Sequence, residues 1–227
     1  MNNIEKNLEH IHQQIREAEI VHDRSPGSVL LLAVSKKKPA SDIRLAWQLG
    51  ERDFGENYLQ EAQQKMLELE DLDINWHFIG AIQSNKTRNI AERFAWVHCI
   101  DRFKIAQRLS DQRPATLPAL NICIQVNLDE ESSKAGISLD AVAQLAGEVY
   151  QLPNIRLRGL MAIPAPSTDF EHQRATFARL AAALASLQQT GIACDTLSMG
   201  MTHDMSAAIA AGSTLVRIGT AIFGERS

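Results

Sequence analysis

The stretch Leu30-Leu31-Leu32-Ala33-Val34-Ser35-Lys36 is a short apolar run that ends abruptly in a lysine. Continuous apolar residues without polar alternation are typical of a strand buried on both faces, as in a parallel sheet. Pro39 follows at a favourable first position of a helix, and Ser41–Trp47 has helical spacing. Lys36 is therefore expected at the carboxyl end of a core strand, the edge of the sheet at which α/β proteins bind ligands.

Strand-like and helix-like segments alternate from this run to the C-terminus. No hairpin turn signals separate the strands, which favours a parallel sheet, and eight such units close into an α/β fold of the (β/α)8 or TIM-barrel type. An open doubly wound sheet is the alternative, but it usually has fewer strands and one ligand loop. The expected strands are Val29–Ser35, Asp53–Phe54, Trp76–Ile79, Trp96–Ile100, Leu120–Leu128, Leu157–Ile163, Thr196–Met199 and Leu215–Ile218. The expected helices between them are Tyr58–Leu69, Ser84–Arg93, Phe103–Ser110, Leu139–Tyr150, Phe170–Gln188 and His203–Ala211.

The first residues of the chain predict one further helix. Ile4, Leu8, Ile11 and Ile15 recur at helical spacing, so residues 1–24 are expected to hold an amphipathic helix that packs outside the barrel. Only a few residues follow the last strand, too few for an ordinary final helix, and the opening helix is expected to cover that gap. A length of 227 residues suits one barrel, and no linker or repeat interrupts it, which predicts a single domain over residues 1–227.

Composition excludes several classes of function. The net charge is -4 and no basic cluster is longer than Lys36-Lys37-Lys38, which argues against nucleic-acid binding. Neither a signal peptide nor a bilayer-spanning apolar stretch is apparent, so a cytoplasmic protein without a membrane partner is expected. The cysteines Cys99, Cys123 and Cys194 lack metal-ligand spacing, which predicts reduced thiols and no metal site. No obvious apolar patch is left once the barrel is covered, and this favours a monomer.

The amine at the end of the first strand has two interpretations. Partial desolvation at this place lowers the pKa of a lysine and frees it for Schiff-base chemistry. The plainer alternative is a solvated loop lysine, which is how we interpret Lys37 and Lys38 beside Lys36.

Other strands also end in polar residues. Asn57 follows a glycine turn, where it either binds a ligand or caps a helix. His77 lies within a strand and faces either the barrel interior or the helix layer; a lone histidine in such a run is more often a core residue than a catalyst. Met161 and Ile163 end the sixth strand with apolar side chains suited to line a flat ligand.

The last two strands predict a phosphate site. Barrel proteins often bind phosphate with the loops after strands seven and eight. Glycines in these loops let backbone N–H groups approach phosphate oxygens, and threonines add hydroxyl donors. An arginine inside a strand must face a polar cavity or be paired. The predicted phosphate-site residues are Ser198, Gly200, Thr202, Arg217, Gly219 and Thr220.

A Schiff-base lysine and a phosphate cup in one barrel together describe a pyridoxal 5'-phosphate (PLP) site. The chain resembles the YggS/PROSC family of pyridoxal phosphate homeostasis proteins over nearly its whole length. The segments that carry the resemblance are Leu31–Lys36, Phe54–Tyr58, Trp76–Gly80, Gln83–Lys86, Gly159–Pro164 and Val216–Gly224.

The resemblance implies PLP bound covalently to Lys36 in the fold of the alanine racemase N-terminal barrel, the fold type III barrel, without a second domain. It also implies that Arg217 contacts the pyridine nitrogen and that the phosphate lies near the glycine- and threonine-containing loops. Asn57 and His77 complete the expected cofactor-binding set. Thr202 stands where the family usually has serine, and His203 where a small or acidic residue is more usual.

Chemistry then favours a carrier over a catalyst. An arginine opposite the pyridine nitrogen disfavours its protonation and weakens the ring as an electron sink. A racemase also needs a second acid/base, and the only tyrosines are Tyr58, which begins an expected helix, and Tyr150, which ends one far along the chain from any mouth loop. We therefore expect a non-catalytic protein, without catalytic residues, that buffers PLP and delivers it to PLP-dependent apoenzymes. The alternatives are an amino-acid racemase, a cofactor-free Schiff-base aldolase and, least favoured, an interaction protein.

Overall fold

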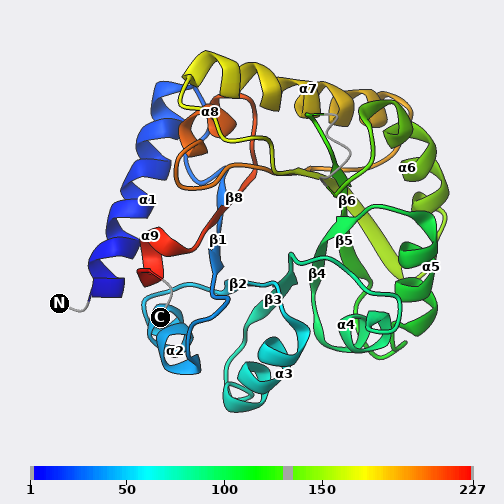
Figure 1. The fold of residues 1–227 in the computed structure, drawn as a ribbon, viewed down its shortest axis with the longest axis horizontal. Coiled ribbons are helices and arrows are strands. Elements are labelled where there is room, and N and C mark those ends of the chain that lie inside the picture. The colour runs from blue at the N-terminus through cyan, green and yellow to red at the C-terminus, as the bar shows by residue number, and fades with distance from the viewer. Residues whose placement is uncertain (1–2, 130–134, 226–227) are drawn as a thin grey trace.

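A computed structural model describes residues 3–129 and 135–225 of the chain. Its strands form a closed barrel in the order β1 to β8, every neighbouring pair is parallel, and β8 pairs with β1 (Figure 1). The predicted TIM barrel is confirmed. The strands are β1 (Leu30–Val34), β2 (Asp53–Glu56), β3 (Asn75–Phe78), β4 (Trp96–Ile100), β5 (Leu120–Val126), β6 (Ile155–Ala162), β7 (Thr196–Ser198) and β8 (Leu215–Ile218).

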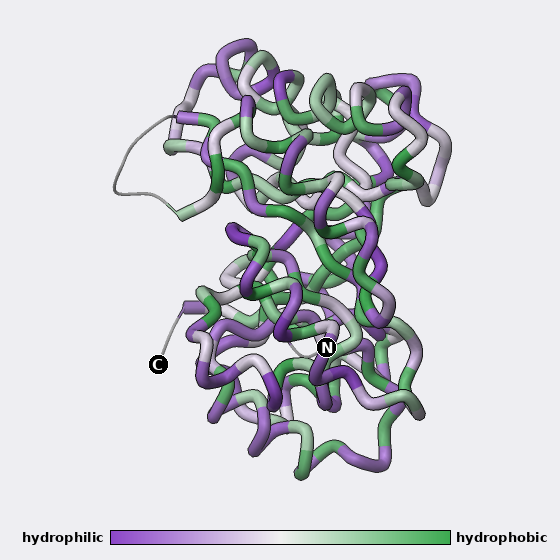
Figure 2. The backbone as a smooth tube through the Cα atoms, turned by 90° about the vertical axis from the view of Figure 1, so that its right-hand side faces the viewer, coloured by the Kyte–Doolittle hydropathy of each residue, from purple (hydrophilic) through white to green (hydrophobic). Residues whose placement is uncertain are grey.

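Helices surround the strands and alternate with them along the chain. They have one apolar face toward the barrel, so hydrophobic and hydrophilic stretches alternate along them in Figure 2. Several helices begin later than predicted: α3 at Leu59, α4 at Thr87, α6 at Val142, after a 3-10 turn, and α8 at Met205. The described helices are α1 (Asn3–Val21), α2 (Ala40–Gln48), α3 (Leu59–Glu68), α4 (Thr87–Arg93), α5 (Phe103–Gln112), the 3-10 turn η1 (Leu139–Ala141), α6 (Val142–Tyr150), α7 (Phe170–Gln189), α8 (Met205–Ala210) and α9 (Thr220–Phe223).

The N-terminal helix α1 lies on the outside of the barrel, in contact with α2, α8 and α9 (Figure 1). Its apolar stripe is buried, and Asn7 Nδ2 donates to the carbonyl of Ile222 in α9 at 2.9 Å. The buried carboxylate of Glu19 accepts backbone N–H bonds from Gly27 and Val29, both at 2.9 Å. These bonds fix the entry of the chain into β1.

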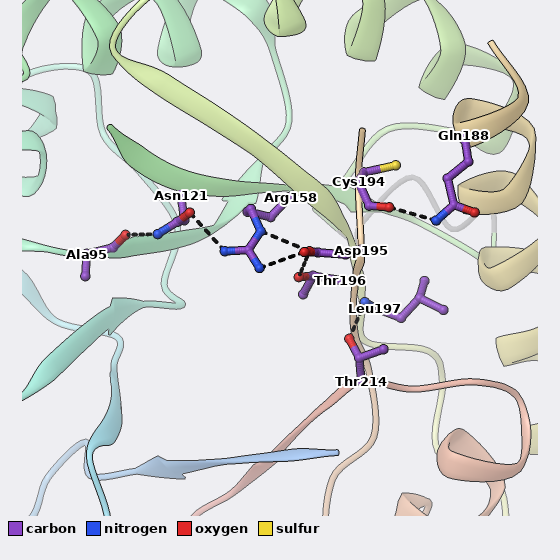
Figure 3. Close-up of polar contacts among 9 residues, drawn as sticks. All are labelled: Ala95, Asn121, Arg158, Gln188, Cys194, Asp195, Thr196, Leu197 and Thr214. Carbon is purple, nitrogen blue, oxygen red and sulfur yellow. Dashed lines mark hydrogen bonds and ion pairs between the residues drawn. The ribbon is translucent and has the colours of Figure 1, made fainter. Parts of the chain in front are cut away.

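Polar side chains cross-link the amino ends of the strands, opposite the expected ligand edge. Arg158 on β6 makes two hydrogen bonds of 2.9 Å to the Asp195 carboxylate and one of 3.1 Å to Asn121 on β5 (Figure 3). Asn121 in turn donates to the Ala95 carbonyl, just before β4 (Figure 3). Charge and hydrogen bonding at this end are used to hold neighbouring strands together.

Within residues 3–129 and 135–225, no helix combines the length and the apolar character needed to cross a lipid bilayer.

Candidate functional site

A cavity of about 490 Å³ opens at the carboxyl ends of the strands. Its walls come from the segments that follow β1, β2, β3, β6, β7 and β8, so residues distant in sequence meet there. Met161 and Ile163 line it as predicted, together with Lys38 and His203. The predicted cofactor-binding residues that line it are Lys36, Asn57, Thr202, Arg217, Gly219 and Thr220.

Lys36 lies at a sharp turn of the chain. The preceding residue, Ser35, is fully buried, and its N–H donates to the Gly55 carbonyl at 3.0 Å. The following residue, Lys37, adopts a left-handed conformation with φ of 61°, which is uncommon for a residue other than glycine. Lys36 itself is half-buried and borders the cavity. The strained turn directs the chain away from the barrel immediately after the amine-bearing residue.

A buried ion pair supports this turn from below. Lys65 Nζ, on α3, lies 2.7 Å from Glu56 Oε1, 2.6 Å from Glu61 Oε1 and 2.8 Å from the Ser35 carbonyl. Ser35 Oγ donates to the same Glu56 oxygen at 2.6 Å. Burial raises the pKa of Glu56, while Lys65 acts in the opposite direction. The network fixes the backbone on the amino side of Lys36 in a dry environment.

Asn57 lines the cavity, and its side-chain oxygen is a buried acceptor. The helix cap of α3 is Tyr58, so the alternative role of Asn57 as N-cap is not adopted. Among the described residues, no hydrogen-bond donor reaches its buried side-chain oxygen. A buried acceptor without a partner costs about 1–3 kcal/mol. Gly80 packs against this segment so closely that a Cβ there would lie 2.2 Å from the Asn57 carbonyl oxygen. The close approach of Gly80 therefore holds the Asn57 backbone in place at the edge of the cavity.

Arg217 forms the floor of the cavity. It is 5% exposed, and its guanidinium donates to the Ser198 carbonyl at 2.5 Å, to Ser198 Oγ at 2.8 Å and to the Ala162 carbonyl at 2.9 Å. Burial lowers its pKa to about 10, so the side chain remains a cation near neutral pH. All three acceptors are neutral oxygens, which leaves a positive charge at the base of the cavity.

Two glycine-containing loops form the predicted cup beside Arg217. Gly200 has φ of 98°, and a Cβ there would lie 2.7 Å from the Ala208 side chain, so only glycine fits. The loop after β7 is further shaped by Asp204, whose carboxylate accepts the Met201 N–H at 2.5 Å. Burial raises the pKa of Asp204. Gly219 caps the short helix α9 and directs it toward the same cavity.

Three of the predicted residues lie outside the cavity lining. Gly200 and Ser198 lie behind it, and Ser198 is fully buried against Arg217. His77 faces the barrel interior, where Nε2 lies 3.0 Å from Asp53 Oδ1 and Nδ1 lies 2.9 Å from His98 Nε2. Both of its ring nitrogens are thus engaged below the cavity, which corrects the expectation that His77 reaches the ligand.

Several residues around the site are not predicted from the sequence. His98, Asp204 and the pair Glu56–Lys65 were not singled out, although each can be related to a weak signal. His98 and Glu56 are polar residues inside strands that are otherwise buried, as Arg217 is. Lys65 has no such signal in the sequence. It lies on an amphipathic helix, where a lysine is ordinary, and its burial follows only from tertiary packing.

An amine, a buried cation and a cup of glycines and hydroxyls suit a ligand that carries both a carbonyl group and an anionic group. No cluster of three or more histidine, cysteine or acidic side chains suited to a metal occurs in the part of the chain that the structure describes.

Fold and cavity together define an alanine-racemase-type barrel with a lysine at the end of β1. Residues 4–227 match the family model of the alanine racemase N-terminal domain. The chain belongs to this family, and within it to the pyridoxal phosphate homeostasis proteins. The predicted resemblance is thereby confirmed.

Relatives of high identity support this assignment. The pyridoxal phosphate homeostasis protein of Pseudomonas aeruginosa is 58% identical over 226 residues, covering 100% of this chain and 97% of that protein. The protein of the same name from Escherichia coli K12 is 52% identical over 229 residues, covering 100% and 98%.

Solved structures agree with the fold. PipY of Synechococcus elongatus with PLP bound is 37% identical with a TM-score of 0.81, covering 92% of this chain and 100% of that chain. Alanine racemase from Corynebacterium glutamicum shares the fold at 16% identity with a TM-score of 0.73; the match covers 98% of this chain but 61% of the racemase.

Proposed function

We propose that this protein binds PLP as a Schiff base on Lys36 and takes part in buffering the cofactor and delivering it to PLP-dependent apoenzymes. The observation that carries the proposal is the meeting of Lys36, Asn57 and Arg217 in one cavity. The names of the relatives and the PLP-bound PipY structure support it. Location in the cytoplasm and a monomeric state belong to the same proposal.

The residues of the cavity fit PLP in kind and in place. Bound PLP supplies an aldehyde that condenses with an amine, and Lys36 is the amine at the half-buried wall. Thr202 and Thr220 line the cup that suits the phosphate, and Asn57 lines the same cavity with a side-chain oxygen that has no donor among the described residues. Met161 and Ile163 provide apolar surface for the ring.

Arg217 and the tyrosines favour a carrier over a racemase. The Arg217 cation disfavours a second positive charge on a pyridine nitrogen held against it. Neither tyrosine of the chain lines the cavity: Tyr58 is 51% exposed at the start of α3, and Tyr150 is 43% exposed at the end of α6. A second acid/base of the kind a racemase needs is therefore not supplied by tyrosine.

Borohydride reduction of the PLP-treated protein, followed by peptide mass mapping, tests the anchor. We expect the pyridoxyl group on Lys36 and its loss in Lys36→Ala, while the control Lys37→Asn, in the neighbouring residue outside the cavity, keeps the label. Labelling at Lys38 or elsewhere would contradict the proposal. Rapid, Lys36-dependent exchange of the α-hydrogen of alanine in deuterated water would instead favour the racemase alternative.

A further inference from the structure

A chain of buried side chains crosses the barrel interior from Arg217 to Asp53. Ser198 Oγ lies 2.8 Å from the Arg217 guanidinium and 2.8 Å from His98 Nδ1. His98 Nε2 lies 2.9 Å from His77 Nδ1, and His77 Nε2 lies 3.0 Å from Asp53 Oδ1. His77, His98 and Ser198 are fully buried, and they come from β3, β4 and β7. The cofactor cavity is thus linked to the amino end of β2.

The chemistry of the two ends fixes the direction of every hydrogen bond. Arg217 can only donate, so Ser198 accepts from it. The Asp53 carboxylate can only accept, so each neutral histidine between them donates toward Asp53, and Ser198 donates its own hydrogen to His98 Nδ1. His98 then carries its hydrogen on Nε2 and donates to His77 Nδ1. His77 in turn carries its hydrogen on Nε2 and donates to the Asp53 carboxylate. Both histidines are therefore neutral Nε2–H tautomers, and all donors point from Arg217 toward Asp53.

Neutral histidines are consistent with their surroundings. Burial lowers the pKa of His77 and, more strongly, of His98, whose pKa is also lowered by the charge of Arg217. Trp96 stacks on His77 with ring centroids 5.4 Å apart, and the Arg158 guanidinium lies 4.6 Å from the centre of the Trp96 ring. Asp53 alone opposes these effects at His77. A hydrogen on His77 Nδ1 would place two donors face to face, and a hydrogen on His98 Nδ1 would reverse the hydrogen bond to Ser198, so protonation of either histidine would break the alignment.

Asp53 also differs from the interior members in its exposure. Its side chain is 15% exposed and borders a second cavity of about 480 Å³. The other described residues around that cavity include His12 and Glu51, which pair at 2.5 Å across α1 and the start of β2. Of the four side chains that extend from Arg217, the carboxylate is therefore the one in contact with solvent, at the end of the barrel away from the cofactor cavity.

We propose that Asp53, His77, His98 and Ser198 form a polarised hydrogen-bond relay that positions Arg217 and gives it a remote counter-charge. Aligned hydrogen bonds polarise one another, so the negative charge of Asp53 makes Ser198 Oγ a stronger acceptor for Arg217. The four are positioning residues: they act on a ligand only through Arg217. The consequence for PLP rests on the proposed function, whereas the tautomers and the polarisation are properties of the protein alone.

The other carboxylate near Arg217 provides the comparison. Asp204 also acts electrostatically on Arg217 but is hydrogen-bonded to the Met201 N–H in the cup loop. A direct counter-charge of this kind needs no histidine between it and the arginine. Only the relay predicts that changes at Asp53 and at His98 have the same effect.

Imidazole ¹⁵N NMR of the protein without PLP tests the relay first. We expect both His77 and His98 as Nε2–H tautomers at pH 7, and we expect Asp53→Asn to shift the His98 nitrogen resonances although the two residues are separated by His77. Asp73→Asn, a charge loss at an 81% exposed carboxylate on the outside of the barrel, should leave them unchanged. An Nδ1–H tautomer at either histidine, or unchanged His98 resonances in Asp53→Asn, would overturn the proposal.

Titration with PLP then tests the effect on Arg217 by a double-mutant cycle. Asp53→Asn and His98→Asn should each weaken PLP binding about fivefold to tenfold, and the double variant should be no weaker than either one. Losses that multiply would mean two independent packing defects and would refute the relay. Failure of the wild-type protein to bind PLP at Lys36 would refute the proposed function but leave the NMR test valid.

Discussion

At the residue scale, Arg217 and Asn57 show the two ways in which this cavity keeps polar groups buried. The guanidinium of Arg217 has three oxygen acceptors within the protein, so it is oriented before any ligand arrives. The Asn57 oxygen is buried without a donor among the described residues, so we expect it to gain a hydrogen bond when a ligand fills the cavity. Arg217 is thus preorganised in the protein without a ligand, whereas we expect Asn57 to gain its hydrogen bond only on binding.

Asn57→Ala tests that difference. The substitution should raise the Kd for PLP about tenfold, which is the loss of one hydrogen bond in a dry site. The free energy of unfolding without PLP should not fall, because the substitution removes an acceptor that had no partner. Absorbance titration and urea denaturation measure the two quantities. A loss of stability with unchanged PLP affinity would show that Asn57 is a structural residue only.

The sequence predicts the residues that interrupt an apolar run better than those whose role depends on tertiary packing. Lys36 and Arg217 could be located because each interrupts an apolar run at a defined position. The orientation of His77 could not, because its place in the barrel depends on how the strands are staggered around the axis. Partners such as His98 and Lys65 come from other elements, and only the closed barrel brings them close.

At the element scale, strand bounds agree closely with the prediction, and helix starts agree less well. The residues ahead of α8 illustrate the reason. Asp204 holds the preceding turn through the Met201 N–H, so the helix begins only at Met205. Such a turn competes locally with the helix. The helical spacing of apolar residues, on which the prediction rests, does not indicate where the turn ends.

Two glycines provide a matched pair of predictions at this scale. Gly80→Ala should destabilise the protein by roughly 1–3 kcal/mol, because its Cβ overlaps the Asn57 backbone. Gly147→Ala, exposed within α6 and with nothing within 4 Å of the added carbon, should stabilise it by about 0.5–1 kcal/mol. Urea denaturation of both variants measures the changes. Equal effects of the two substitutions would contradict the close packing at Gly80.

At the scale of the whole molecule, the buried histidines make stability depend on pH. Burial lowers the pKa of His77 and His98 in the folded protein, whereas in the unfolded chain they titrate near 6.5. Below about pH 6.5 the unfolded chain therefore binds more protons, and the free energy of unfolding falls as pH decreases. Each histidine contributes a slope of up to about 1.4 kcal/mol per pH unit.

Denaturation curves between pH 7.5 and pH 5 measure this slope. His98→Asn should remove part of it, while His10→Asn on the exposed face of α1 serves as the control. A wild-type stability that rises on acidification, or a slope that His98→Asn leaves unchanged, would show that the histidines are charged in the folded state.

The position of α1 has a consequence for the order of the chain. This helix begins beside α9 and ends at the entry to β1, so it runs in the direction that a helix after β8 would take. The strand–helix units thus follow one another around the whole barrel, and α1 takes the place of the helix that would follow β8 and α9. A circular permutant that joins these two helices and opens the exposed loop Ala115–Pro118 would keep every strand between its present neighbours.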